Sequence, residues 1–208
     1  MKIISIFDRS GIMVRPWYQA GHEVVTIDCH LPRHDMPAIC SDIRDVPIQP
    51  CDVLFSFVPC TEFAGSGARW WSTKPPERLD DALELVEITK SWIRQAEWWM
   101  VENPVGRLSS LWRKPSWSFD PHEYAQLSSK AHEERYTKKT CIWSNFEKPV
   151  MHSLSPILGS KMHRIPPSPD RQYLRSLTPA GFSQAVFRHL TGSPLRQIPL
   201  FSEAHHVG

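Results

Sequence analysis

Cys60 follows Pro59 and opens a loop rich in small residues, Cys-Thr-Glu-Phe-Ala-Gly-Ser-Gly at 60–67. A thiol is a strong nucleophile as the thiolate, and positive charge or helix amides nearby favour that form at neutral pH. Arg69 and Lys74 are the nearest cations along the chain. The pattern favours a nucleophilic Cys60. The alternative, an inert structural cysteine, is what we expect of the remaining four, Cys29, Cys40, Cys51 and Cys141.

Glu102 is the second residue with the chemistry of a reactive group. It follows the apolar run Trp-Trp-Met-Val at 98–101 and precedes Asn103 and Pro104. Apolar surroundings raise the pKa of a carboxyl group, because they disfavour its charged form. A protonated Glu102 would suit donation to a ring nitrogen. The alternative is a surface glutamate that caps a helix or forms a salt bridge.

Both residues follow predicted strands of an α/β fold. Short β-branched or apolar runs separated by amphipathic segments indicate a mostly parallel sheet with helices on both faces. Beyond residue 106, frequent prolines leave one expected strand and one expected helix. We predict strands at 3–7, 23–28, 52–58, 98–101 and 140–143, and helices at 14–21, 78–94 and 178–190.

Four polar side chains fall at the carboxyl ends of these strands: Asp8, Asp28, Cys60 and Glu102. In open α/β sheets, ligands bind in the crevice beyond those ends. The sequence therefore predicts that the four side chains converge on one site.

Composition limits the class of protein. The 208 residues carry a formal net charge of +2, which permits contact with phosphates without demanding it. Five scattered cysteines predict no disulfide framework and a reducing compartment, the cytoplasm. No apolar run is long enough to cross a membrane, and the run at 3–7 is too short for a signal sequence. We expect one domain at 1–190, with a proline-rich region at 144–174, and a tail at 191–208.

Two segments resemble the cytosine-5 DNA methyltransferases. The first is a Pro-Cys pair followed by Phe-Ala-Gly-Ser-Gly at 63–67, and the second, about forty residues later, is Glu-Asn-Pro-Val-Gly-Arg-Leu at 102–108. The resemblance covers roughly residues 1–107. It is strongest with short phage-type members, which share both segments and a later Tyr-Thr-Lys-Lys-Thr, here 136–140.

The resemblance implies a Rossmann-like methyltransferase fold, S-adenosylmethionine as cofactor and cytosine as substrate. Cys60 would add to carbon 6 of the ring, Glu102 would stabilise the charge that develops toward N3, and a base in duplex DNA would first be flipped out of the stack. The implied cofactor-binding residues are Phe7, Asp8, Gly11, Asp28, Asp42, Ile43 and Pro59. The implied substrate-binding residues are Ser66, Gly67, Arg69, Asn103, Arg107, Lys138 and Lys139.

The chain departs from the family pattern in several places. Arg9 replaces the first glycine of the cofactor loop, and the family's Gln-x-Arg-x-Arg segment and its carboxyl-terminal Gly-Asn-Ser-Val are missing. Residues 136–140 and the segment 175–190 lie where these two patterns would be. The region 144–174 offers little for reading several base pairs, because that takes side chains on a rigid element in a groove.

We therefore expect an enzyme that methylates cytosine C5 in DNA with little sequence specificity. Two alternatives stay open: a C5-methyltransferase of a free cytosine nucleotide, and a catalytically inactive relative that binds cofactor or DNA. We expect no metal, because the spacing of the clustered cysteines and histidines matches no common zinc pattern. Those residues are Cys29, His30, His34, Cys40, His205 and His206.

Overall fold

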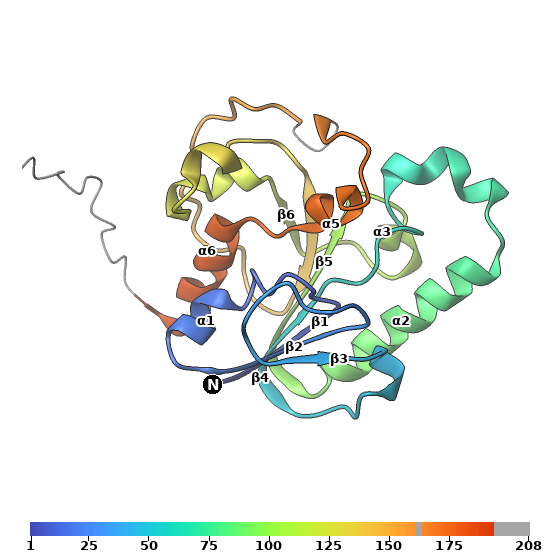
Figure 1. Cartoon of the computed structure of the whole chain (residues 1–208), viewed down its shortest axis with the longest axis horizontal. Helices are drawn as coiled ribbons and strands as arrows, with labels where there is room; N and C mark the ends of the chain where they lie inside the picture. The colour runs from blue at the N-terminus through green and yellow to red at the C-terminus, as the bar shows by residue number, and fades with distance from the viewer. Residues whose placement is uncertain (161–163, 194–208) are drawn as a thin grey trace, which may run out of the picture.

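The computed structural model describes residues 1–160 and 164–193, which form an α/β fold around one seven-stranded sheet (Figure 1). The strand order is β3-β2-β1-β4-β5-β7-β6. Neighbouring strands from β3 to β5 are parallel, whereas β7 is antiparallel to both β5 and β6. The strands are β1 (Lys2–Ile6), β2 (Glu23–Asp28), β3 (Ala38–Cys40), β4 (Cys51–Ser56), β5 (Ala96–Pro104), β6 (Trp117–Phe119) and β7 (Thr140–Ser144).

The helices follow the strands along the chain. The α-helices are α1 (Arg15–Gln19), α2 (Glu77–Ile93), α3 (Leu108–Leu111), α5 (Arg171–Ser176) and α6 (Ala180–Thr191). The 3-10 helices are η1 (Ile43–Asp45), η2 (Gly65–Thr73), η3 (Pro121–Glu123), η4 (Ala125–Leu127) and η5 (Ala131–Glu134).

The order of the five parallel strands matches the beginning of the Rossmann order 3-2-1-4-5-6 and is compatible with a Rossmann-like fold. The strand order reverses between β1 and β4, and the chain leaves these adjacent strands in opposite directions across the sheet. The Phe57 amide still donates to the Ile6 carbonyl at 3.1 Å, so the two strands part immediately after these residues. Sheets of this kind bind their ligands beyond the strand ends at such a switch point.

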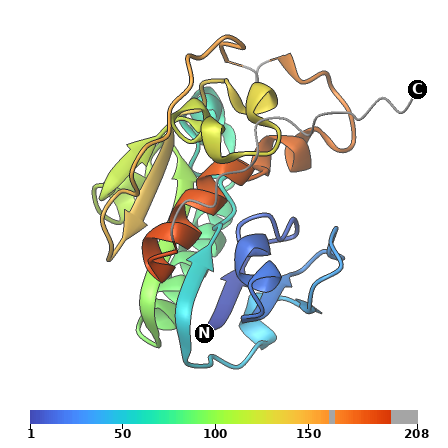
Figure 2. The same ribbon diagram turned by 90° about the vertical axis from the view of Figure 1, so that its left-hand side faces the viewer.

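Alternating strand residues build two cores, one on each face of the sheet. Ile3 and Phe55 face α1 and α6, while Ile4 and Leu54 face the other side, on which Trp92 of α2 packs. Burial on both faces explains why these strands are almost continuously apolar. Figure 2 shows α6 (red) alongside the sheet, with α1 (blue) below it.

The prediction of a mostly parallel α/β sheet is confirmed, and the expected strands and helices are present with small shifts of their ends. The expectation of a single strand beyond residue 106 is wrong, because β6 pairs with β7, and β3 was not predicted. The helix expected at 14–21 is shorter, since α1 ends at Gln19. The region 144–174 is not wholly a loop, because α5 begins within it.

Residues 145–160 form neither helix nor strand. They hold their course through long-range backbone hydrogen bonds, such as those that pair His152 with Glu123 and Gln126 at 2.9 and 3.2 Å. The Leu154 and Ile157 amides continue this pattern with the carbonyls of His122 and Arg135. Most of the predicted tail, residues 194–208, lies outside the described residues.

Helix α6 attaches the end of the described chain to its beginning. The Ser183 hydroxyl donates to the carbonyls of Ile12 and Met13 at 3.0 and 2.8 Å. The buried carboxylate of Glu134 accepts from the first two amides of α6, those of Ala180 and Gly181. Because these amides have no partner within the helix, Glu134 caps α6 from a distant segment.

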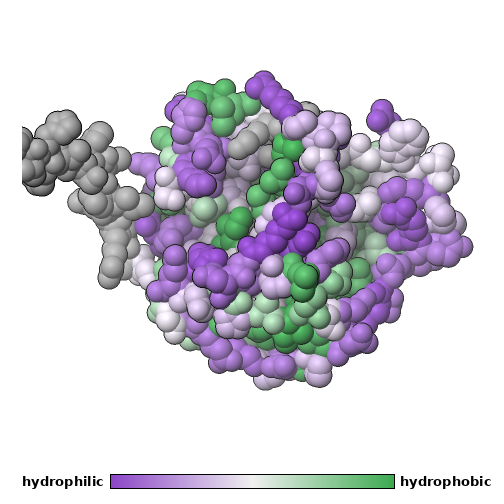
Figure 3. Space-filling view, in the orientation of Figure 1, coloured by the Kyte–Doolittle hydropathy of each residue, from purple (hydrophilic) through white to green (hydrophobic). Residues whose placement is uncertain are grey.

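The surface carries hydrophobic and hydrophilic residues side by side. In the face shown in Figure 3, hydrophobic residues lie near the centre and hydrophilic residues along the left and right margins. Within residues 1–160 and 164–193, no helix combines the length and the apolar character that a membrane crossing requires.

Candidate functional site

Cys60 lies just beyond the carboxyl end of β4, at the switch point of the sheet. It is accessible at the surface, yet the atoms around it desolvate the thiol and raise its pKa. The charge of Glu102 raises this pKa further, while the charges of Lys138 and Arg175 lower it. Three segments distant in sequence therefore act on one sulfur atom.

The backbone around Cys60 is fixed by a tight turn. The amides of Phe63 and Ala64 donate to the Cys60 carbonyl at 3.0 and 2.8 Å. The Phe63 side chain is fully buried, in one cluster with Val58 and with Val101 of β5. The turn thus holds Cys60 between two buried residues, Val58 and Phe63.

The Cys60 loop is clamped to the segment that follows β5. The Asn103 side-chain amide donates to the Val58 carbonyl at 2.8 Å, and the Gly65 amide donates to the Val105 carbonyl at 2.9 Å. Arg107 donates twice, from its amide to the Phe63 carbonyl at 2.9 Å and from Nε to the Glu62 carbonyl at 2.7 Å. The segments that carry Cys60 and Glu102 therefore form one rigid unit.

Gly106 lies inside this clamp, and Gly106→Ala should break it. A Cβ at this position would lie 1.9 Å from the Phe63 carbonyl oxygen and 2.8 Å from the Gly65 nitrogen, both of them backbone atoms. We expect a loss of about 1–3 kcal/mol in the free energy of unfolding, the usual cost of overpacking. Urea unfolding followed by circular dichroism measures it.

Gly67→Ala is the matched control, because a Cβ there meets no atom within 4 Å. Equal stabilities of the two variants would show that the clamp does not constrain the loop.

Glu102 is half-buried on β5, where it pairs in register with Ile142 of β7. Burial raises the pKa of its carboxyl group, and the charge of Lys138 partly opposes the rise. This is the direction expected from the apolar run before Glu102. The carboxyl group can therefore carry a proton at a pH where an exposed glutamate has lost it.

Lys138 acts on both reactive groups, since its charge lowers the pKa of Cys60 and that of Glu102. Its amide donates to the Asp120 side chain at 2.7 Å, and its carbonyl accepts from the Thr140 hydroxyl at 2.8 Å, just before β7. Lys138, in the basic segment 136–140, is thus near enough to Cys60 and Glu102 for its charge to act on both.

The cations named from sequence as neighbours of Cys60 contact other groups. Lys74 pairs at 2.7 Å with the buried Glu62, which also pairs with Arg78 at 2.9 Å. The guanidinium of Arg69 lies 5.0 Å from the centre of the Trp70 ring. Arg175 of α5, which sequence reasoning missed, acts on Cys60 across more than one hundred residues of chain, and no local signal marks it.

The loop after β1 has an unusual backbone conformation. Phe7 is the one non-glycine residue of the described chain with a positive φ, 58°, a conformation that costs energy for a bulky side chain. The buried Asp8 carboxylate accepts from the amides of Ser10 and Gly11 and from the Ser5 hydroxyl. Asp8 therefore shapes this loop, rather than offering both oxygens to a ligand.

Gly11 has a φ of 64°, and a Cβ there would clash with the side chains of Met36 and His34. Asp28 lies at the end of β2, where its Oδ1 accepts from the His30 amide at 2.8 Å. The His30 ring also contacts Oδ1, at 3.0 Å, and no described residue donates to Asp28 Oδ2. One carboxylate oxygen thus remains for a hydroxyl group.

The remaining cofactor candidates lie on the side of α2. Asp42 caps η1 and pairs with Arg44, which also pairs with Asp81. Ile43 is buried in the core, so its side chain mainly supports η1. Pro59 borders a small cavity of about 190 Å³. The other residues around it are Thr61, Glu62, Arg78, Asp81, Ala82 and Leu85.

Arg9, the departure from the family's glycine, joins three segments. Its Nε donates to the Leu31 carbonyl at 3.0 Å, and its carbonyl accepts from the Arg33 amide at 2.9 Å. The guanidiniums of Arg9 and Arg33 lie 5.5 and 4.4 Å from the centre of the Tyr173 ring. Helix α5 is thereby held against the loops that follow β1 and β2.

The predicted substrate-binding residues divide into two groups. Asn103 is buried and Arg107 half-buried, and the side chains of both donate the hydrogen bonds of the clamp described above. The others leave surface for a ligand: Ser66, Arg69 and Lys139 are exposed, and Gly67 and Lys138 are half-exposed.

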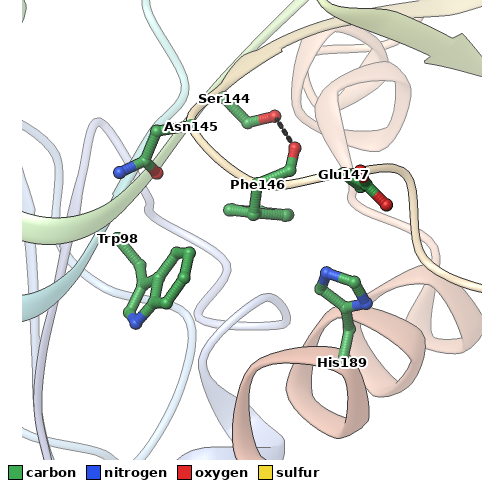
Figure 4. Close-up of a pocket in the computed structure, with 6 residues that line it drawn as sticks. All are labelled: Trp98, Ser144, Asn145, Phe146, Glu147 and His189. Atoms are coloured by element: carbon green, nitrogen blue, oxygen red, sulfur yellow. Dashed lines mark hydrogen bonds between the residues drawn. The ribbon is translucent and has the colours of Figure 1, made fainter.

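A surface pocket of about 440 Å³ lies elsewhere, at the amino-terminal end of β5 (Figure 4). Trp98 and His189 face it from opposite sides, and the Ser144 hydroxyl donates to the Phe146 carbonyl at its border. The pocket holds none of the predicted site residues. It is separate from the crevice.

The structure brings only part of the cluster Cys29, His30, His34 and Cys40 together, and Asp28 joins it. Asp28, Cys29 and His30 offer ligand atoms within 4.8 Å of one another, and the Cys40 thiol contacts the Cys29 carbonyl. His34 instead contacts the Thr26 hydroxyl at 3.0 Å. His205 and His206 lie outside the described residues.

Comparison of the chain with protein-family models and with curated proteins finds no match to either.

Proposed function

We propose that this chain is an S-adenosylmethionine-dependent methyltransferase that adds a methyl group to C5 of cytosine in DNA, with little sequence specificity. The observation that supports it most is the position of Cys60 just beyond β4 at the switch point, where hydrogen bonds clamp its loop to the segment of β5 that carries Glu102. A nucleophile, a proton-bearing carboxyl group and a cation converge there from three segments. The reaction uses each of them.

Cys60 acts as the nucleophile. Carbon 5 of cytosine is too electron-poor to take a methyl group directly. Addition of the Cys60 thiolate to carbon 6 forms a C–S bond and moves electron density toward carbon 5 and N3. Lys138 and Arg175 favour the thiolate, because both charges lower the pKa of this thiol.

Glu102 acts at N3 of the ring. Its raised pKa keeps a proton available for the nitrogen as negative charge develops there. Transfer of that proton leaves Glu102 as a carboxylate next to Lys138. Loss of the C5 proton to water later expels the Cys60 thiolate, and N3 returns its proton to Glu102.

S-adenosylmethionine, when bound, supplies the methyl group that carbon 5 takes. Residues of this chain fit its nucleoside part in two respects. Asp28 has one carboxylate oxygen for ribose hydroxyls, and the small cavity beside Pro59 and Leu85 offers apolar contact. The positive φ of Phe7 turns the chain directly after the end of β1.

A free cytosine nucleotide is the second candidate substrate. Residues 145–160 form neither helix nor strand, so they present no rigid element to a DNA groove. A nucleotide would need no such element.

Transfer of label tests the proposal. The protein is incubated with methyl-labelled S-adenosylmethionine and, in separate reactions, duplex DNA, single-stranded DNA or deoxycytidine monophosphate. Label at C5 of cytosine is the expected result. Cofactor binding without transfer to any of the three would support the inactive relative instead.

Lys138→Met should slow the reaction of the Cys60 thiol. Without this charge the pKa values of Cys60 and Glu102 both rise, so less thiolate is present at a given pH. We expect alkylation of Cys60 by iodoacetamide at pH 8 to slow roughly three- to tenfold, as a shift of up to about one pKa unit implies. Mass spectrometry of the Cys60 peptide follows it.

Lys139→Met is the control for that measurement, because the Lys139 charge acts on Cys141. Lys138→Arg should restore the wild-type rate. Equal alkylation rates in Lys138→Met and wild type would show that the charge of Lys138 does not act on the Cys60 thiol.

A further inference from the structure

Trp70 is the only exposed tryptophan of the nine, all of which lie in the described part of the chain. Its exposed fraction is 53%. The Arg69 guanidinium lies 5.0 Å from the centre of its ring and makes no ion pair with any described residue. Trp70 therefore presents an aromatic surface next to an unpaired cation.

The structure of η2 explains this exposure. With about three residues per turn, a 3-10 helix directs consecutive side chains to different sides. Trp71 points toward the clamp, where the Arg107 guanidinium lies 4.5 Å from its ring centre. Because Trp71 anchors the helix, its neighbours Arg69 and Trp70 are turned outward.

Both ends of η2 are tied to the neighbours of Cys60. Its first residue, Gly65, donates its amide to Val105 in the clamp. Just beyond its last residue, Lys74 reaches back to the Thr61 carbonyl at 2.9 Å and to the Glu62 carboxylate at 2.7 Å. Trp70 thus lies on a closed loop that begins and ends beside the nucleophile.

We propose that Trp70 and Arg69 form a stacking surface for an unpaired base of a single-stranded polynucleotide, next to the cytosine that Cys60 attacks. This inference rests on the proposed function and narrows its substrate class. The exposed Val105, opposite Gly65, extends the apolar area toward the clamp.

A single strand fits this surface better than a duplex does. Proteins that bind single strands stack bases on aromatic side chains and contact the backbone with cations, and every base offers a face for stacking. The paired bases of a duplex are stacked on one another and present only their edges in the grooves. The net charge of +2 and the lack of regular structure at 145–160 also suit a short contact without sequence readout.

Fluorescence anisotropy of a fluorescein-labelled single-stranded oligodeoxynucleotide tests the inference by binding alone. Trp70→Ala should weaken binding roughly 5- to 150-fold, the range for loss of one stacked base. Trp70→Phe should retain most of the affinity. Arg69→Ala should lower the slope of log affinity against log salt by about 0.7, the value for one lost phosphate contact on a single strand.

Tyr18→Ala is the control, since Tyr18 is an exposed aromatic residue of α1, away from the Cys60 loop. It should bind like wild type. Wild-type affinity of Trp70→Ala for the single strand would overturn the inference, as would an equal loss for the same oligonucleotide in a duplex. Failure of methyl transfer would instead contradict the proposed function and leave these binding results intact.

Discussion

Cys60→Ala is expected to abolish methyl transfer to cytosine, by on the order of 10⁴-fold or more, as loss of a covalent nucleophile does in other enzymes. No other cysteine can replace the sulfur, because Cys51 and Cys141 are buried on β4 and β7, and Cys29 and Cys40 lie at the ends of β2 and β3. The measurement is transfer of label at saturating cofactor. The fold should persist, because the Cys60 side chain is exposed and small.

Cys40→Ser serves as the control, because Cys40 is an exposed thiol on the edge strand β3. A second readout follows the covalent step directly. Wild-type protein should form a stable adduct with DNA that contains 5-fluorocytosine, and mass spectrometry should locate it on the Cys60 peptide. An adduct on another cysteine, or full transfer by Cys60→Ala, would refute the assignment.

Glu102→Gln is expected to reduce kcat/KM by about 10²- to 10⁴-fold, the usual contribution of a positioned proton donor. Glutamine can still accept and donate hydrogen bonds, but it cannot transfer a proton to N3. Because the Glu102 carboxyl group is half-buried and its pKa is raised, the neutral amide should fit without unfolding the protein. Thermal unfolding of the variant checks that point.

The pH profile separates a lost proton donor from a disturbed pocket. The reactive form needs Cys60 ionised and Glu102 protonated, so the wild-type rate must fall at high pH, where Glu102 holds no proton. Glu102→Gln should lose this fall and rise with pH until the thiol is fully ionised. This rise should occur at a lower pH than ionisation of the Cys60 thiol in the wild type. The reason is that the charge of Glu102 raises the pKa of Cys60, and the variant lacks that charge. A profile parallel to wild type would contradict the role of Glu102.

The sheet was largely predictable because its strands are long enough to show a pattern. In strands β1, β2, β4 and β5 most apolar side chains are buried or half-buried, and both faces of the sheet are covered, which leaves apolar runs in the sequence. Strands β3 and β6 have three residues each and were missed, because so short a segment carries no periodicity. The course of 145–160 depends on backbone hydrogen bonds to residues 122–135, which no local composition encodes.

For the site, sequence identified groups at strand ends and could not assign their partners. Cys60 and Glu102 were identified because each follows an apolar run, although β5 continues to Pro104 and Glu102 therefore lies within the strand and not after it. Asn103 and Arg107 hold the clamp through hydrogen bonds to residues about 45 positions away. Asp8 binds the amides of its own loop. Arg175 was missed because α5 reaches Cys60 only after the chain has folded back.

The attachment of α6 to the loop before α1 has a consequence for how the protein is made. Ser183 bonds to Ile12, a residue synthesised 171 positions earlier, and Phe182, Ala185 and Val186 complete the core around Trp17 and Phe55. Until the ribosome has released α6, that face of the sheet is uncovered. Nascent chains that lack α6 should therefore expose hydrophobic surface and be prone to aggregation, and this face of the sheet should be covered only after α6 has left the ribosome.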